Sequence, residues 1–519
     1  MDFKQAKILA SDLISSPDAS VVDHINFAKK IAGLELPEYV RKLKAAFLSN
    51  FTLLGLSEVF KARALFHNIA AETYLGEYNQ YAQEILNPES GLNKFKPKII
   101  YFLMDSADID SKQISELTEK AEESGAKVLL VSDFGNFKEH WYTKYKQLGD
   151  MRLALDAFPV LADQLMAKAV AVCGATKKCL VLDLDNTLWR GIVGEDGADK
   201  VVPNKKLQEH ILGLYKAGAI LAINSKNNEE DAWEAIEKHP DMVLRKNHFA
   251  AWQINWNDKA SNIRAIADEL MLGTDSFVFV DDDPFQQSLV RESCPEVAVL
   301  HPDQLEKYVG FSSGKLTAED KRRGEMYAEE RTRRSLQSSL KSVDDFLKEL
   351  KLEVTIREVK ADSPIIPRLS QMTQKTNQFN MTTKRWSDDD IRNFLSKDHR
   401  MLAVSAIDRF GDYGTIGLLS VKKLGDATWD INNFLMSCRI LGRGIEDALL
   451  AKVSELAFEN KAAGLSGYFE ATKKNKVLCE NFYSNKGFRC LATNSSGAGY
   501  FYDLNKPFPY PANIKVNFA

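Results

Sequence analysis

The chain has 519 residues, of which 27% are charged, and its formal net charge is −4. This balance supplies no basic field for nucleic acid, and no apolar run approaches the ~18 residues of a membrane span, so neither partner is expected. At roughly 150 residues per domain, the length predicts three or four domains. The N-terminus lacks the apolar core of a signal peptide, which favours a cytoplasmic protein. Six cysteines without a Cys-x-x-Cys pair or a nearby His set predict reduced thiols, neither zinc ligands nor disulfides.

The first 170 residues alternate helical patterns with short apolar strands at 45–48, 99–104 and 128–131, which predicts a parallel α/β sheet. Ser49 stands at the end of the first of these strands. The segment resembles an SGNH-hydrolase-like domain, in which such a serine is the nucleophile. No His before residue 170 has an Asp three positions earlier to activate it. We therefore expect Ser49 to be structural, in a domain for docking or substrate positioning, with a modified acyl-transfer site as the alternative.

The most informative stretch is 181–189, where an apolar strand ends in Asp183 and Asp185 with Thr187 two positions on. Open α/β sheets place their chemistry at the carboxyl ends of strands. Asp183 is the candidate nucleophile that forms an aspartyl-phosphate, and Asp185 the candidate acid and base. Two carboxylates this close repel, and their all-oxygen character favours Mg²⁺ over Zn²⁺. The alternative is an Asp-rich turn that caps a helix.

Three further groups arrive in the order that phosphoryl transfer needs. A strand over 219–223 leads to Ser225, a donor for phosphoryl oxygens, and Lys259 opens a helical pattern over 259–272. A strand over 277–280 runs into Asp281, Asp282 and Asp283 before Pro284. About forty residues separate Asp185 from Ser225 and about thirty separate Ser225 from Lys259, so neither gap holds a cap domain and the site should be open to a large substrate.

These groups resemble the four motifs of the haloacid dehalogenase superfamily. The resemblance is closer to the FkbH-like branch, through the strings Leu182-Asp-Leu-Asp-Asn-Thr-Leu-Trp-Arg-Gly191, Ser225-Lys-Asn227 and Val280-Asp-Asp-Asp-Pro-Phe285. It implies a magnesium site formed by Asp183, Asp185 and Asp282, with Asp282 favoured over Asp281. Asp283 stands where the branch more often has Asn, and it should lie outside the metal's ligands.

From 312 to 350 apolar strand patterns give way to dense mixed charge, which predicts a solvated helix. Ser342, with Asp345 three residues on, predicts a helix start and a domain boundary nearby. The expected organisation is α/β throughout, in three domains: an SGNH-type sheet at 1–172, a capless haloacid dehalogenase-type parallel sheet at 173–310, and, after a charged helical linker at 311–345, a mixed sheet at 346–519.

The last third carries a second motif. A strand over 429–437 leads into Cys438-Arg439-Ile-Leu-Gly442-Arg-Gly444, and an amphipathic helix follows. The two glycines let backbone amides approach phosphate oxygens at the positive end of that helix, and Arg439 adds a fixed charge. Cys438 beside this cation is a candidate thiolate nucleophile, or else a small buried apolar residue.

Asn475 and the segment 481–488, which contains Tyr483, strengthen this motif. Together they resemble GNAT acyltransferases, whose loop holds the phosphate end of the pantetheine arm of coenzyme A or of a carrier protein. The resemblance implies that Tyr483 protonates a departing thiolate, with packing beside Phe482 as the equal alternative, and that Cys438 carries an acyl group. Strings at 373–380 and 408–412 also resemble FkbH-like proteins, so the likeness spans most of the chain.

FkbH-like proteins of polyketide pathways take a glyceryl unit from 1,3-bisphosphoglycerate, remove its remaining phosphate and place it on an acyl carrier protein. The resemblance therefore implies a glyceryl transferase with its own phosphatase, a phosphorylated three-carbon substrate and a separate carrier protein as partner. One alternative is a phosphatase–acyltransferase that modifies a sugar or amine in surface-polysaccharide synthesis from an acyl-coenzyme A donor. Another is a scaffold without catalysis.

Overall fold

The computed structural model describes residues 1–16, 18–105, 110–134, 137, 149–311, 322–340, 342–376, 378–397, 399–424, 428–437, 440–472 and 475–519. Two compact units divide the chain, one over 1–324 and the other over 325–519. Helices and strands alternate through both units, so the fold class is α/β, as the sequence predicts. The break between the units falls inside the predicted charged linker, and the finer domain bounds stay predictions.

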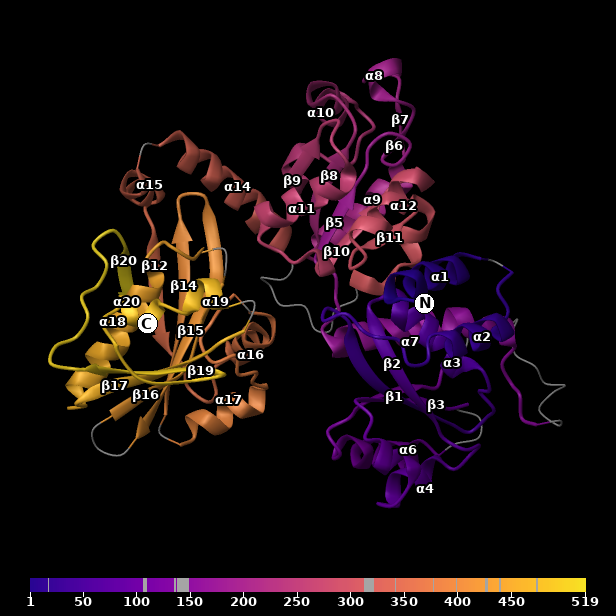
Figure 1. Cartoon of the computed structure of the whole chain (residues 1–519), viewed down its shortest axis with the longest axis horizontal. Helices are drawn as coiled ribbons and strands as arrows, with labels where there is room; N and C mark the ends of the chain where they lie inside the picture. Colours follow the sequence, from indigo (N-terminus) through magenta and orange to yellow (C-terminus); the bar gives the residue numbers. More distant parts are fainter. Residues whose placement is uncertain are drawn as a thin grey trace. The chain divides into compact units, whose positions relative to one another are not determined.

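A four-stranded parallel sheet in the order β2-β1-β3-β4 opens the first unit (Figure 1). The three predicted strands are present as β1 (Arg41–Ser49), β3 (Ile99–Leu103) and β4 (Lys127–Val131), and β2 (Ile69–Leu75) joins as an edge strand. Because side chains alternate along a strand, Phe47 packs on one face and Leu48 on the other. The first face packs against α3 (Leu56–Phe66) and α7 (Phe158–Cys173), and the second against α4 (Tyr81–Leu86), α5 (Gly91–Phe95) and α6 (Ser111–Glu122).

The second sheet of this unit is five-stranded and parallel, in the order β11-β10-β5-β8-β9. β5 (Cys179–Leu182) lies at its centre between β10 (Phe277–Val280) and β8 (Ile220–Ser225), so the three motif-bearing strands end side by side. Only α8 (Val193–Asp196), α9 (Lys205–Lys216) and a short ribbon of β6 (Trp189–Arg190) and β7 (Val202–Pro203) separate β5 from β8. The other elements are β9 (Phe249–Ile254), α10 (Glu229–Lys238), α11 (Lys259–Leu270), α12 (Pro284–Ser293) and β11 (Ala298–Leu300), with 3-10 turns at Leu155–Ala157, Lys246–His248, Thr274–Ser276, Pro302–Lys307 and Val309–Phe311.

The first helix, α1 (Phe3–Ser15), reaches this second sheet layer, and α2 (Val21–Lys30) follows it. The Lys7 ammonium donates hydrogen bonds to the carbonyl oxygens of Pro295, at 2.6 Å, and Val297, at 3.1 Å, just beyond the end of α12. Burial lowers the pKa of Lys7 well below its usual value. The turn that follows α12 is therefore tied to the first helix by the Lys7 side chain.

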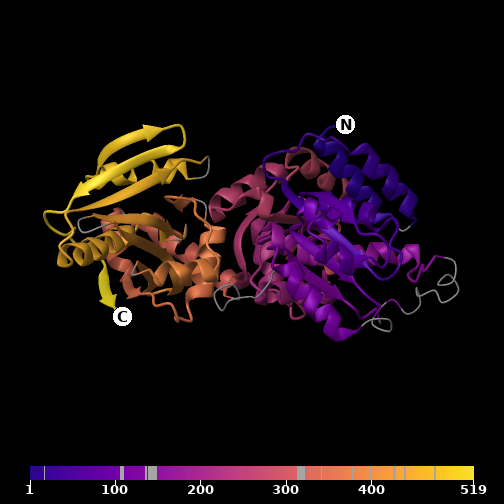
Figure 2. The same ribbon diagram turned by 90° about the horizontal axis from the view of Figure 1, so that it is seen from below.

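The second unit is built on a mixed sheet in the order β18-β19-β17-β16-β15-β14-β12-β20, with β13 paired to β16 beside this path. Its two ends, the yellow strands β17 to β19 and the C-terminal β20, lie apart in Figure 2. Helix α18 (Ile445–Glu459) packs its buried side chains into the main core of this sheet, as the predicted amphipathic pattern requires. The bounds are β12 (Glu353–Glu358), α16 (Ile366–Lys375), β13 (Phe379–Asn380), α17 (Asp388–Leu395), β14 (Arg400–Asp408), β15 (Gly411–Leu424), β16 (Thr428–Met436), β17 (Gly464–Glu470), α19 (Lys476–Cys479), α20 (Phe482–Asn485), β18 (Arg489–Asn494), β19 (Gly497–Asp503) and β20 (Lys515–Phe518).

Two helices precede this sheet, α14 (Arg323–Ser339) and α15 (Val343–Leu350), and Ser342 caps α15 as predicted. The expectation of a fully solvated helix over the charge run is wrong for one face of α14. Arg333 is 1% exposed and donates to both oxygens of Asp408, at 2.8 and 2.9 Å. Glu330 accepts a hydrogen bond of 2.6 Å from Arg443. The charges are paired with partners far along the chain, which sequence spacing does not reveal.

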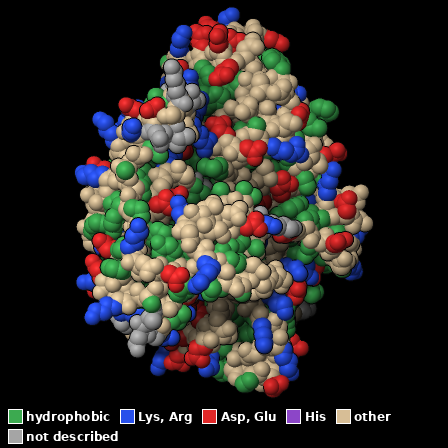
Figure 3. Space-filling model, turned by 60° about the vertical axis from the view of Figure 1, so that its left-hand side comes forward, with side chains coloured by type: hydrophobic (Ala, Val, Ile, Leu, Met, Phe, Trp, Pro, Cys, Tyr) green, Lys and Arg blue, Asp and Glu red, His purple; other side chains and the backbone are tan. Residues whose placement is uncertain are grey.

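Acidic and basic side chains are intermixed on the face drawn in Figure 3, without a field of one sign. Within the described residues, no helix combines the length and apolar character needed to span a bilayer.

Candidate active site

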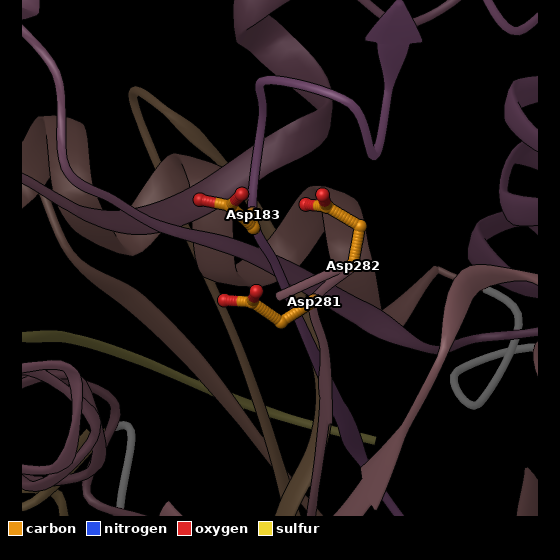
Figure 4. Close-up of side chains that lie close together, drawn as sticks. All are labelled: Asp183, Asp281 and Asp282. Carbon is orange, nitrogen blue, oxygen red and sulfur yellow. The ribbon is translucent and has the colours of Figure 1, made fainter. Parts of the chain in front are cut away.

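Three carboxylates meet at the carboxyl edge of the second parallel sheet (Figure 4). Asp183 follows β5, and Asp281 and Asp282 follow β10, the strand paired with it. One oxygen from each lies within 4.8 Å of the others. Asp183 is 6% exposed and Asp281 is fully buried. Parallel strands that pair end at the same edge of the sheet. The pairing of β5 with β10 thus brings together acids that are about a hundred residues apart in the sequence.

Lys259 joins two of these acids. Its ammonium donates to Asp183 Oδ1 at 2.7 Å and to Asp281 Oδ2 at 2.5 Å, and the side chain is almost fully buried. It stands at the first position of α11, where Asp258 caps the helix and the Asn224 amide donates to the Lys259 carbonyl oxygen at 2.9 Å. The helix start therefore fixes the backbone from which the lysine reaches the acids.

Burial dominates the electrostatics of this cluster. It raises the pKa of Asp183 to about 6, against the lowering effects of Lys259 and of the Ser225 hydroxyl, while Asp281 raises it further. Burial also raises the pKa values of Asp281 and Asp282. Lys259 supplies one positive charge to three carboxyl groups. A divalent cation would compensate the remaining negative charge, and an all-oxygen donor set matches Mg²⁺.

Asp185 lies beside this cluster and outside it. Its Oδ1 accepts hydrogen bonds from the Trp189 indole at 2.8 Å and the Val193 amide at 3.1 Å, and its Oδ2 accepts one from the Asn227 amide at 2.8 Å. Both oxygens are engaged, so the side chain has a fixed direction. That Asp185 binds a metal ion stays a prediction.

Smaller polar groups complete the first site. Ser225 is buried at the end of β8, where its hydroxyl hydrogen-bonds Asp183. Thr187 donates to Asp282 Oδ1 at 3.3 Å. Asp283 accepts from the Phe285 amide at 2.8 Å as the cap of α12, so it lies outside the acid group, as expected.

Sequence reasoning passed over two residues. The resemblance favours Asp282 over Asp281 as the metal ligand, and it gives Asn227 no role beyond its place in a motif string. The signal for Asn227 is its place just past a strand end beside the Asp183 loop. The signal for Asp281 is its position as the first residue after a fully buried strand, where a side chain turns inward.

The second motif is described only in part. Cys438 and Arg439 lie outside the described residues, so their roles stay predictions. Gly442 and Gly444 have φ values of 74° and 81°, which L residues rarely adopt. The arginine between them, Arg443, points inward and is 8% exposed. The loop therefore turns on its two glycines immediately before α18, while the binding of phosphate oxygens by its amides stays a prediction.

Asn475 and Tyr483 both face the interior. The Asn475 amide donates to the carbonyl oxygens of Asn380 and Glu470, each at 2.8 Å. Tyr483 is fully buried, and burial raises its pKa far above its usual value. Its ring packs against Phe482 and two other aromatic rings, and its hydroxyl has no hydrogen-bond partner among the described residues. The geometry favours the packing alternative for Tyr483, while its role as an acid stays a prediction.

In the first sheet, Ser49 is 6% exposed at the end of β1. Its hydroxyl donates to the Leu103 carbonyl oxygen at 2.7 Å and accepts from the Phe51 amide at 3.1 Å. These bonds tie β1 to β3 and to the following turn, which is the structural role expected for this serine.

Neither a protein-family model nor a curated protein matches the chain. Among solved structures, it is similar to the N-terminal part of the protein BF1531 from Bacteroides fragilis, which contains a phosphatase domain and was crystallised with Mg. The identity is 25% over 61% of this chain and 100% of that one, with a TM-score of 0.44. The PaiA N-acetyltransferase from Thermoplasma acidophilum, in complex with coenzyme A, is 13% identical over 29% of this chain and 99% of its own, with a TM-score of 0.24. Ard1 from Thermoplasma volcanium is 15% identical over 30% and 99%, with a TM-score of 0.23.

Proposed function

We propose that the first unit is a Mg²⁺-dependent phosphatase that acts through an aspartyl-phosphate. The observation that carries this proposal is the buried cluster of Asp183, Lys259, Asp281 and Asp282 at the carboxyl edge of a parallel sheet. A site with one lysine and three acids is built to receive a cation together with an anionic substrate. When bound, Mg²⁺ would be held by Asp183 and Asp282 and would offset negative charge on the phosphate.

In the proposed reaction an Asp183 oxygen attacks phosphorus, and the bond from phosphorus to the leaving oxygen breaks. The leaving oxygen takes a proton from Asp185. Asp185 then accepts a proton from water as that water attacks the aspartyl-phosphate, which releases inorganic phosphate and restores Asp183. Lys259 and Ser225 would donate hydrogen bonds to phosphoryl oxygens. The Lys259 ammonium, 2.7 Å from Asp183 Oδ1, favours the ionised and hence nucleophilic form of that carboxyl group.

The substrate we propose is a phosphoglyceryl group derived from 1,3-bisphosphoglycerate. This group is transferred to the phosphopantetheine thiol of an acyl carrier protein. A thiolate, with Cys438 the candidate, would attack the acyl phosphate carbon and expel phosphate, and the acyl group would pass to the carrier as a thioester. The support is the resemblance to FkbH-like proteins together with the short connection between β5 and β8, which holds no cap-sized insertion that would exclude a substrate carried on a protein. The second unit would hold the pantetheine arm.

The test incubates the full chain with 1,3-bisphosphoglycerate, Mg²⁺ and a carrier bearing phosphopantetheine, and reads intact masses of both proteins. Glyceryl on the carrier is the expected product. Asp183→Asn should leave phosphoglyceryl in its place, while Asp199→Asn, an exposed acid of the same domain, should behave as the wild type. A carrier that stays unmodified would refute the glyceryl assignment. Transfer from an acyl-coenzyme A to a sugar or amine would replace it with the alternative reaction.

A further inference from the structure

Two central strands of the second unit separate part-way along their length. β16 and β17 pair in parallel from Thr428 with Gly464 to Ile431 with Gly467. Both then continue without pairing, β16 to Met436 and β17 to Glu470. The other edge of β16 pairs with β15 as far as Met436. The separation therefore leaves one edge of each strand open to a third partner.

A segment of the same chain, residues 379–384, takes that place. Its first two residues are β13, which pairs antiparallel with the end of β16. The Met381 amide then donates to the Phe434 carbonyl oxygen of β16 at 2.9 Å, and the Met381 carbonyl oxygen accepts from the Glu470 amide of β17 at 2.8 Å. One residue thus bonds both separated strands, so the segment lies between them.

Side chains hold the segment in this position. Asn475 donates to the Asn380 carbonyl oxygen at 2.8 Å, which is what its buried amide does in this structure. The Thr382 hydroxyl donates to the Asn432 carbonyl oxygen at 3.2 Å. Phe379 packs edge-on against Phe434 and Phe482, with ring centroids 5.3 Å from each. To leave this position the segment would have to give up these polar and apolar contacts, which favour the closed state.

Unpaired main-chain groups of separating strands are a recognition surface for an extended chain that carries amides. The pantetheine arm assigned to this unit by the proposed function, on which this step rests, is such a chain. We infer that residues 379–384 are a gate: they occupy the bonding positions between β16 and β17, and a pantetheine arm enters only when they leave. A ligand that binds a minor open state shows an affinity reduced by the fraction of open molecules.

Calorimetric titration of the full chain with coenzyme A tests the gate. Met381→Pro removes the amide that bonds Phe434, whereas Met381→Leu keeps that amide and nearly the same volume. We expect Met381→Pro to bind coenzyme A at least about 30-fold more tightly than the wild type, since a closed gate lowers apparent affinity by the open fraction. Met381→Leu should match the wild type. Equal affinity in all three proteins, or binding by none, overturns the gate.

Amide hydrogen exchange gives a second reading that needs no variant. At millimolar coenzyme A, the wild-type amides of Met381 and Glu470 should exchange faster, because their hydrogen bonds to the carbonyl oxygens of Phe434 and Met381 are lost when the segment leaves. Coenzyme A that binds while these two amides keep their protection overturns the gate. The outcomes also separate the gate from the proposed function: carrier loading that Met381→Pro leaves unchanged removes the gate alone, and tighter coenzyme A binding without carrier loading removes the function alone.

Discussion

The Asn227 side-chain amide donates to Asp185 Oδ2 across 2.8 Å, from the loop after β8 to the loop after β5. Trp189 and Val193 hold the other oxygen of the same carboxyl group. A general acid has to be aimed as well as ionisable. We therefore propose a positioning role for Asn227: in the proposed reaction it would fix the direction in which Asp185 presents its proton.

Asn227→Ala should lower kcat for phosphate ester hydrolysis by about tenfold to a hundredfold with little change in KM, since misaligned general acid catalysis loses rate in this range. An alkyl phosphate should suffer more than 4-nitrophenyl phosphate, whose leaving group needs no proton. The neighbouring variant Asn228→Ala, at an exposed position, is the control. Equal losses for both esters would show that Asn227 does no more than support the fold.

Adjacent acids after β10 should respond differently to loss of charge. Asp282→Asn should raise the Mg²⁺ concentration for half-maximal activity by at least about tenfold, because it removes a charged ligand. Asp283→Asn keeps an acceptor for the Phe285 amide and should shift that concentration less than about twofold. Magnesium titration of chelator-treated protein gives both values. If the two variants shift together, Asp282 is not a ligand.

Removing a buried arginine should cost far more than removing an exposed one. Arg443→Met leaves Glu330 without its 2.6 Å partner beside α14, and breaking a buried pair costs about 3–5 kcal/mol. Arg409→Met removes an exposed pair with Glu349 and should cost under about 1 kcal/mol. Urea unfolding measures both free energies of unfolding. The double variant Arg443→Met with Glu330→Gln should recover part of the loss, and no recovery would contradict the pairing.

Acid should destabilise the first unit through His67. Burial first, and then Lys177, Lys7 and Arg63, lower the pKa of this fully buried histidine from 6.5 to about 3. Between these values the unfolded chain binds a proton that the folded chain does not, so the free energy of unfolding falls as pH falls, by about 5 kcal/mol in total.

Urea unfolding between pH 7 and pH 4 measures that slope. His67→Phe should flatten it, because a ring that stacks on Tyr308 remains while the titrating group is gone. His210→Phe, at a partly exposed position, should leave the slope unchanged. Equal slopes in the two variants would assign the acid sensitivity to other groups.

Buried central strands were predictable from sequence, whereas β4 is the one edge strand of the two parallel sheets that was predicted. β10 occupies the predicted residues and β8 lies within two residues of its prediction, because both are continuous apolar runs between two helical layers. The other three edge strands of these sheets, β2, β9 and β11, were not predicted. β2 is only half-buried and carries Glu72, and β11 has three residues, so neither presents an apolar run of usable length.

The candidate site divides in the same way. The approach of Asp183, Ser225, Lys259 and Asp282 follows from parallel strands that end at one edge, so the motifs suffice to predict it. The hydrogen bonds that engage Asp185 and Asn475 come from Asn227 and from the carbonyl of Asn380, which lie 42 and 95 residues away. Whether a polar side chain already has hydrogen-bond partners depends on such distant residues. The local spacing of residues in the sequence does not predict these partners.

Helix α12 begins at the acidic turn of Asp281 to Asp283, and at its far end Lys7 of α1 bonds the carbonyls that follow it. A single rod of ten residues therefore connects the opening segment of the polypeptide to the place where phosphate chemistry is proposed. Trimming the first helix would release the distal end of that rod and let the acidic turn shift. The N-terminal segment thus supports the sheet that carries the candidate active site. The two should be expressed and studied together.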